Sequence, residues 1–160
     1  MPDWRTAYLE QAFSDFTILQ KLIQDGAPLC HQLHYFQMTT EKMAKGFLTP
    51  PGGPRYPKVH DAFVKFINVS KSRPEFRRAS PFADSQQFAR YVESLRHKAK
   101  EVEDLSPEGG DHPNPEYPWE VGGTIYTPLA YPFSSLDFGK NPQMMKLLKF
   151  VEDCLEIRDH

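Results

Sequence analysis

The stretch between residues 30 and 48 combines an apolar stripe with a line of polar side chains at helical spacing. His34, Gln37, Glu41 and Lys45 recur every three or four residues, so on an α-helix they lie along one side. Asp15 belongs to the preceding predicted helix and adds a second carboxylate opposite this line. Together these groups can recognise a nucleotide base or phosphate. They can equally form a hydrogen-bonded network that fixes the pairing of two helices, and the sequence leaves both interpretations open.

Arg90 and His97 form a second candidate group, and their chemistry is that of phosphodiester cleavage. Such a reaction needs a group that exchanges a proton near neutral pH and a cation that holds the phosphate. The two residues lie seven positions apart on one side of a predicted helix, nearly opposite its apolar seam, which includes Phe88 and Val92. The pair therefore predicts a ribonuclease site only if a dimer cleft covers it. A solvated charged face is the alternative.

A third group surrounds the start of the next predicted helix. Asp61 suits the positive N-terminal end of a helix, and His60 precedes it. With Arg55 and Lys58 these residues can bind a phosphate, or they can form a local cap or a hydrogen bond within the bundle.

Residues 71–83 add a basic segment with four cations in eight positions. It can contact phosphate groups or form a solvated loop. The four cations are Lys71, Arg73, Arg77 and Arg78.

The sequence predicts neither a metal site nor a cofactor. A zinc site needs three or four converging ligands. His31, His34 and Glu41 would need His60 or His112 to complete a set, and neither a His-Glu-x-x-His motif nor a cysteine pair supports one. Phosphate-binding glycine loops are also absent from the sequence.

Composition predicts one globular domain over residues 1–160, because 39% of the residues are hydrophobic and 25% are charged. The net charge of −2 argues against a protein that coats nucleic acid, but it allows a local basic patch. We expect a cytoplasmic protein without a signal peptide or membrane segment. Cys30 and Cys154 fall in predicted amphipathic helices, which favours buried, reduced thiols.

Apolar periodicity and capping residues predict an all-α fold, a five-helix antiparallel up-and-down bundle. The expected helices cover about residues 3–24, 28–48, 58–70, 84–105 and 141–157. Their N-terminal caps are Asp3, Asp84 or Ser85, and Asn141.

Residues 106–140 are rich in proline, glycine and aromatic residues. We expect an ordered arm over the bundle, with a short β-hairpin near residues 124–131. Its aromatic residues can anchor the arm or stack on bases. They include Tyr117, Trp119 and Tyr126.

Four motifs, in this order, resemble the HEPN domain, a small all-α family associated with nucleotides and RNA. They are Ser14-Asp15-Phe16, Cys30-His31-Gln32, Glu41-Lys42-Met43-Ala44-Lys45 and His60-Asp61, and the resemblance covers about residues 1–105. It implies a helical bundle that is often dimeric and is often the partner of a minimal nucleotidyltransferase in a two-component system of the toxin–antitoxin type. Many members are ribonucleases with an Arg-x4–6-His motif.

Two segments match that ribonuclease motif loosely. They are Arg55-x4-His60 and Arg90-x6-His97, whereas the commoner form Arg-Asn-x-x-x-His does not occur in the sequence. We therefore predict a non-catalytic or weakly catalytic module, acting as a homodimer, that binds a nucleotide, RNA or a partner protein. A metal-independent ribonuclease using Arg90 and His97 is the first alternative. A dimerisation scaffold is the second.

Overall fold

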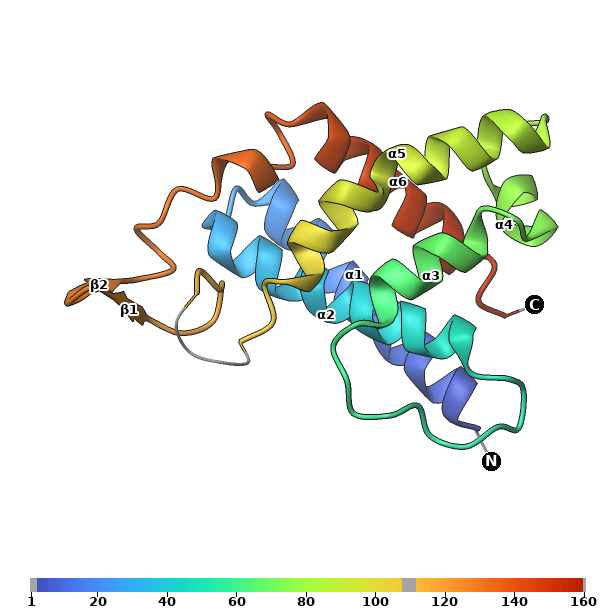
Figure 1. Cartoon of the computed structure of the whole chain (residues 1–160), viewed down its shortest axis with the longest axis horizontal. Coiled ribbons are helices and arrows are strands. Elements are labelled where there is room, and N and C mark those ends of the chain that lie inside the picture. The colour runs from blue at the N-terminus through green and yellow to red at the C-terminus, as the bar shows by residue number, and fades with distance from the viewer. Residues whose placement is uncertain (1–2, 108–111, 160) are drawn as a thin grey trace.

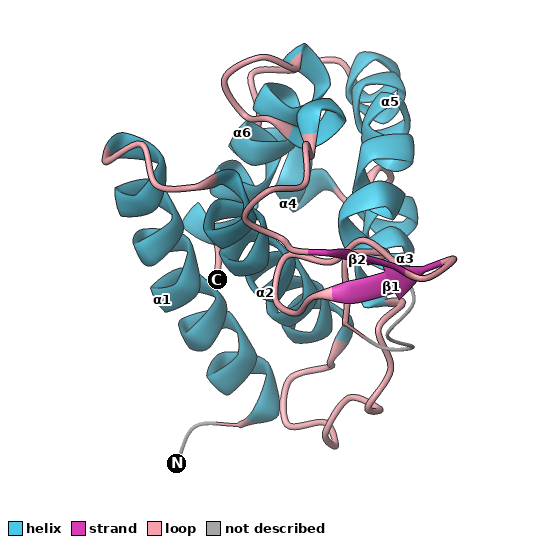
Figure 2. Ribbon diagram, turned by 90° about the vertical axis from the view of Figure 1, so that its left-hand side faces the viewer, coloured by secondary structure: helices cyan, strands magenta, loops and turns pink. Residues whose placement is uncertain are grey.

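Two long antiparallel helices, α1 (Trp4–Gln24) and α2 (Leu29–Leu48), pack side by side at one edge of the molecule (Figure 2). The computed structural model describes residues 3–107 and 112–159. Asp3 caps α1, because its Oδ1 accepts a hydrogen bond of 2.8 Å from the backbone N–H of Thr6. Its Oδ2 accepts a second from the N–H of Gly52 at 2.8 Å. The cap therefore also ties the start of α1 to the chain that leaves α2.

The remaining elements follow in chain order (Figure 1). They are α3 (Ala62–Ser70), α4 (Pro74–Ala79), α5 (Ser85–Glu103), β1 (Trp119–Val121), β2 (Thr124–Tyr126), the 3₁₀ helix η1 (Ser134–Leu136) and α6 (Pro142–Glu156). Within the described residues the fold is thus mainly helical with one small antiparallel sheet, as the sequence predicts in broad terms.

Phenylalanine rings from four helices form the centre of the core. Phe47 of α2 stacks on Phe66 of α3, with ring centroids 5.4 Å apart, and both rings meet the edge of Phe76 from α4. Phe150 of α6 lies beside Phe66 at 6.2 Å. Such aromatic contacts add to the stabilisation from burial. This cluster holds the short helix α4 against α2 and α6.

One predicted boundary was wrong, and one helix was missed. The third helix begins at Ala62 rather than near residue 58, so His60 and Asp61 precede it. The basic segment 71–83 contains α4, a helix that the sequence analysis missed. Six residues are too few to show helical periodicity, and α4 has no side-chain N-cap, although Pro74 at its first position is compatible with a helix start.

The capping predictions for the two later long helices were confirmed. The carboxylate of Asp84 accepts a hydrogen bond of 2.9 Å from the N–H of Gln87. Asn141 accepts bonds from the N–H groups of Gln143 and Met144 at 3.0 Å and 3.2 Å. These local interactions fix where α5 and α6 begin.

A β-hairpin extends from the helical body within the predicted arm (Figure 1). It begins at Trp119, earlier than expected, because Gly122 and Gly123 form the turn with the positive φ angles that a type I′ turn requires. Trp119 is 3% exposed and stacks on Tyr126 across the two strands. Trp119 therefore serves as an anchor of the arm, whereas Tyr117 is exposed.

Both cysteines are buried and neither forms a disulfide bond. Burial raises the pKa of the Cys154 thiol well above its usual value, so this group stays protonated and unreactive near neutral pH. None of the helices in the described residues combines the length and the apolar character that a membrane-spanning helix needs.

Candidate functional site

Glu41 is the centre of a polar network on α2, which we call the Glu41 network. Lys45 donates to its Oε1 at 2.7 Å, and Gln37 donates to its Oε2 at 2.9 Å. The imidazole Nδ1 of His60 lies 3.0 Å from the same Oε2. The structure therefore brings four of the predicted ligand-binding residues together, three from one helix and one from the segment that precedes α3.

Hydrogen bonds within the network engage both carboxylate oxygens of Glu41. Burial would raise the pKa of Glu41, but the hydrogen bonds from Lys45 and His60 outweigh that effect and lower it. Gln37 and Lys45 are 7% and 8% exposed, so little of either side chain is open to a ligand. The geometry is that of a structural connection between α2 and the chain that leads into α3.

Asp15 takes part in a separate interaction, at the contact between α1 and α2. Its Oδ2 accepts from the ammonium of Lys42 at 2.5 Å, and its Oδ1 accepts from Gln11 at 3.1 Å. Asp15 is 6% exposed. This ion pair supports the interpretation that polar residues fix the helix pairing, and the partner is Lys42 rather than a member of the predicted line.

His34 lies apart from the Glu41 network and faces the arm. Its Nδ1 is 3.8 Å from the carboxylate of Glu116, and its ring meets Tyr35 edge-on. Arg55 lies over the ring of Trp4, with 5.1 Å between its guanidinium carbon and the ring centroid. The eight predicted ligand-binding residues therefore do not form one site.

Asp61 is half-exposed and belongs to a local ion pair. It occupies the N-cap position of α3 without capping it through its side chain, and its carboxylate instead pairs with Lys65 at 2.8 Å. Of the two local roles expected for His60 and Asp61, the side-chain cap does not form, whereas His60 makes the hydrogen bond within the bundle, to Glu41. The two residues of the first loose match to the ribonuclease motif contact different helices, because Arg55 packs on α1 and His60 on α2.

Arg90 and His97 are both on the exposed side of α5. The His97 side chain is 84% exposed, and its Nε2 lies 3.0 Å from the carboxylate of Glu101 on the same helix. A surface hollow of about 480 Å³ beside His97 is lined by Val64, Glu93, Arg96 and Lys100, and the described lining does not include Arg90. Within one chain, the pair is not enclosed in a common site.

The described residues contain no group of three or more His, Cys, Asp or Glu side chains that could hold a metal ion. The residues that the sequence analysis considered as zinc ligands do not all lie together. His60 bonds to Glu41, whereas His112 bonds to the carbonyl of Ser106.

Three arginines from two segments line another surface hollow, which we call the arginine hollow. They are Arg5 of α1, Arg73 just before α4, and Arg78 of α4. The hollow has a volume of about 280 Å³, and its remaining described lining consists of Phe47, Glu75, Phe76 and Ile157.

The aromatic core positions two of these guanidinium groups. Arg5 lies over Phe47 at 5.5 Å and donates to the backbone oxygen of Thr49 at 3.4 Å. Arg73 lies over Phe76, 5.0 Å from the ring centroid. A guanidinium that stacks on an aromatic face can still donate hydrogen bonds along its edge. The edge of Arg73 donates to the backbone oxygen of Phe47 at 3.5 Å and to Glu75. The phenylalanine cluster thus holds cations at the surface as well as filling the interior.

Glu75 is the one carboxylate among the described lining residues. It accepts from Arg73 at 2.6 Å and 2.7 Å. Partial burial raises the pKa of Glu75, but a backbone hydrogen bond and the contacts with Arg73 and Arg78 outweigh this and lower it. Glu75 is therefore ionised at neutral pH. Three guanidinium groups against one carboxylate leave the hollow positively charged.

The basic segment identified in the sequence is divided by the fold. Arg73 and Arg78 reach the arginine hollow, whereas Arg77 donates to the carbonyl of Ala83 at 2.5 Å and Lys71 pairs with Glu93 at 3.1 Å. Sequence reasoning missed Arg5, the third member. No local signal connects it with residues almost seventy positions away.

Comparisons of the chain with protein-family models, with curated proteins and with solved structures found no match.

Proposed function

We propose that this chain is a HEPN-like, non-catalytic module that binds a nucleotide or RNA through phosphate contacts at the arginine hollow. The observation that carries the proposal is the convergence of Arg5, Arg73 and Arg78 around a single carboxylate. Guanidinium groups present parallel N–H donors that match phosphate oxygens, and charge-assisted bonds of this kind are among the stronger hydrogen bonds in proteins.

The size and lining of the hollow support a binding role. Its volume of about 280 Å³ is near the lower limit of small-molecule sites, which suits a phosphate and its sugar more than a deeply enclosed nucleotide. The described lining includes no histidine, so no group there exchanges protons near neutral pH. The hollow has the components to hold a phosphodiester without those needed to cleave it.

The resemblance to HEPN domains extends the proposal to architecture and partners. We regard α1, α2, α3, α5 and α6 as an up-and-down bundle of that type, with α4 as an addition that supplies Arg78. The same resemblance suggests a homodimer and a minimal nucleotidyltransferase as the protein partner, in a system of the toxin–antitoxin type. Light scattering on the purified chain, alone and mixed with such an enzyme, tests both suggestions.

The phosphate site is tested by titrating short single-stranded RNA and nucleotides into the full chain, with fluorescence anisotropy as the measurement. Arg78→Ala removes an exposed guanidinium and should weaken binding about tenfold, near the lower end of the range for one charge-assisted contact. Arg5→Gln should act in the same direction. Arg96→Ala is the matched control, because Arg96 is an exposed arginine of α5 outside the described lining of the arginine hollow.

Equal affinity for wild type and Arg78→Ala would exclude the arginine hollow as the binding site. No binding of either ligand would exclude the nucleotide and RNA functions altogether, leaving the partner-protein function.

A further inference from the structure

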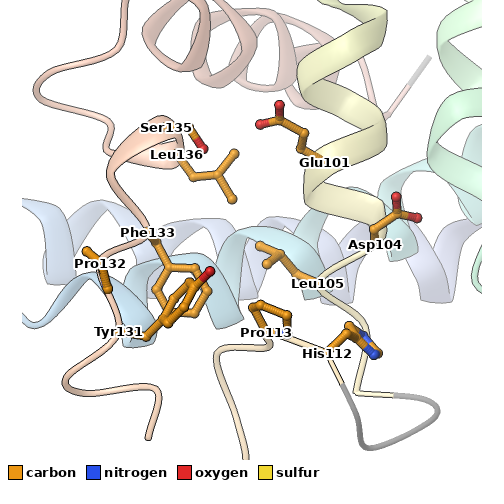
Figure 3. Close-up of a pocket in the computed structure, with 10 residues that line it drawn as sticks. All are labelled: Glu101, Asp104, Leu105, His112, Pro113, Tyr131, Pro132, Phe133, Ser135 and Leu136. Carbon is orange, nitrogen blue, oxygen red and sulfur yellow. The ribbon is translucent and has the colours of Figure 1, made fainter. Parts of the chain in front are cut away.

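The arm and the C-terminal part of α5 line a further, open pocket, which we call the arm pocket (Figure 3). Its volume is about 330 Å³, within the range of small-molecule sites. Apolar and aromatic side chains form most of its wall, and four polar residues lie among them. The apolar set is Leu105, Pro113, Tyr131, Pro132, Phe133 and Leu136, and the polar set is Glu101, Asp104, His112 and Ser135.

The aromatic wall is built into the fold. Phe133 and Leu136 are each 5% exposed, and the ring of Tyr131 meets that of Phe133 at 4.8 Å. Trp119 packs edge-on against Tyr131 at 5.0 Å, so the base of the hairpin supports the wall from behind. A ligand would thus meet a preformed apolar surface and would not have to order it.

The tautomer of His112 is set by its neighbour. Its Nε2 lies 2.8 Å from the backbone oxygen of Ser106, and a carbonyl oxygen can only accept, so Nε2 carries the hydrogen. In the neutral ring, Nδ1 is then a hydrogen-bond acceptor. The carboxylates of Glu101 and Asp104 also only accept. Apart from Tyr131, the ionisable side chains of the described lining are therefore hydrogen-bond acceptors toward a ligand.

The sequence around the arm pocket contains acidic residues but no lysine or arginine. Residues 101–139 contain eight Asp or Glu residues, whereas all 19 Lys and Arg residues of the chain lie outside this stretch. Lys98 and His97 engage both oxygens of Glu101, whereas Lys100 engages one oxygen of Asp104. None of these three partners belongs to the described lining. Phosphate and carboxylate ligands would meet acceptors of like charge, which disfavours them.

We infer that the arm pocket binds an organic cation, an ammonium group attached to an aromatic or aliphatic body. Figure 3 shows Asp104 and His112 on one side of the pocket, and Tyr131 and Phe133 on the other. The ammonium group lies on the side of the pocket that offers the second oxygen of Asp104 and Nδ1 of His112, while the body of the ligand packs on Tyr131. An aromatic face also attracts a cation directly. This activity is separate from the proposed function, because the arginine hollow selects the opposite charge.

Three small probes of nearly the same shape test the inference on the full chain. They are 2-phenylethylamine, 2-phenylethanol and 3-phenylpropionate, which present a cationic, a neutral and an anionic head group. Chemical-shift titration should give saturable binding of the amine with Kd of about 1 mM or tighter, as for a good ligand of this size. The anion should bind at least about tenfold more weakly. Equal binding of amine and anion, or no saturable binding of the amine, would overturn the inference.

A pair of variants places the binding in the pocket. Asp104→Asn removes the charge of a half-exposed side chain, so the fold is retained, and it should weaken the amine about fivefold. Glu93→Gln is the matched control on the same helix, outside the described lining, and should leave amine binding unchanged. Unchanged amine affinity in Asp104→Asn would refute the assignment. RNA binding at the arginine hollow should be the same in all three proteins.

Discussion

The Glu41 network and the arginine hollow both gather charged side chains, but only the first balances them. In the network, both oxygens of one partly buried carboxylate are taken up by Lys45, Gln37 and His60. In the hollow, three arginines and one carboxylate, Glu75, line the surface, and Glu75 pairs with Arg73. Internal balance favours stability, whereas unbalanced charge that the fold holds in place favours binding. The two regions should therefore respond to substitution in opposite ways.

The largest effect should come from the network. Glu41→Gln leaves the mostly buried ammonium of Lys45 without its counter-charge, so we expect the free energy of unfolding to fall by about 2 kcal/mol. Urea denaturation measures this change. RNA affinity should not change in the same variant. A loss below about 0.5 kcal/mol would place the network among ordinary surface ion pairs.

The pH dependence of the unfolding free energy also tests the contribution of Glu41. The pKa of Glu41 is lowered from 4.5 by folding, so the stabilisation from its ionised form is fully present above pH 4.5 and is lost as pH falls through the folded pKa. The difference in unfolding free energy between wild type and Glu41→Gln should therefore shrink below pH 4.5. A difference that stays constant down to pH 3 would show that the charge of Glu41 contributes nothing.

Salt should distinguish the arginine hollow from the network. If Arg78 neutralises one phosphate of single-stranded RNA, it contributes about −0.7 to the slope of log affinity against log salt concentration. Arg78→Ala should reduce that slope by about 0.7, while its unfolding free energy changes by no more than about 0.5 kcal/mol. An unaltered slope would mean that Arg78 makes no phosphate contact.

The smallest effect should come from His97. Because its ring is exposed and paired with Glu101 on its own helix, we expect His97→Ala to leave RNA binding unchanged and to show the same lack of cleavage as wild type. Gel analysis of a labelled RNA checks this. If the wild type cleaved RNA and His97→Ala did not, the alternative function would be supported, a ribonuclease that uses Arg90 and His97 at a dimer cleft.

Much of the helical framework could be predicted because its signals are local. Asp3, Asp84 and Asn141 each cap a helix within three residues of the group they bind. The start of α3 and the whole of α4 lacked such signals. The candidate sites were harder, since spacing along one helix predicted the contacts of Glu41 with Gln37 and Lys45, but not its contact with His60.

The sequence by itself therefore determined the long helices, their caps and the polar line on α2, because the helical repeat and the cap both act over a few residues. Only the tertiary structure decided which charges meet. Packing of Phe47 and Phe76 brings Arg5 beside Arg73 and Arg78. That arrangement depends on how distant segments pack in one core, so the periodicity of a single segment cannot predict it.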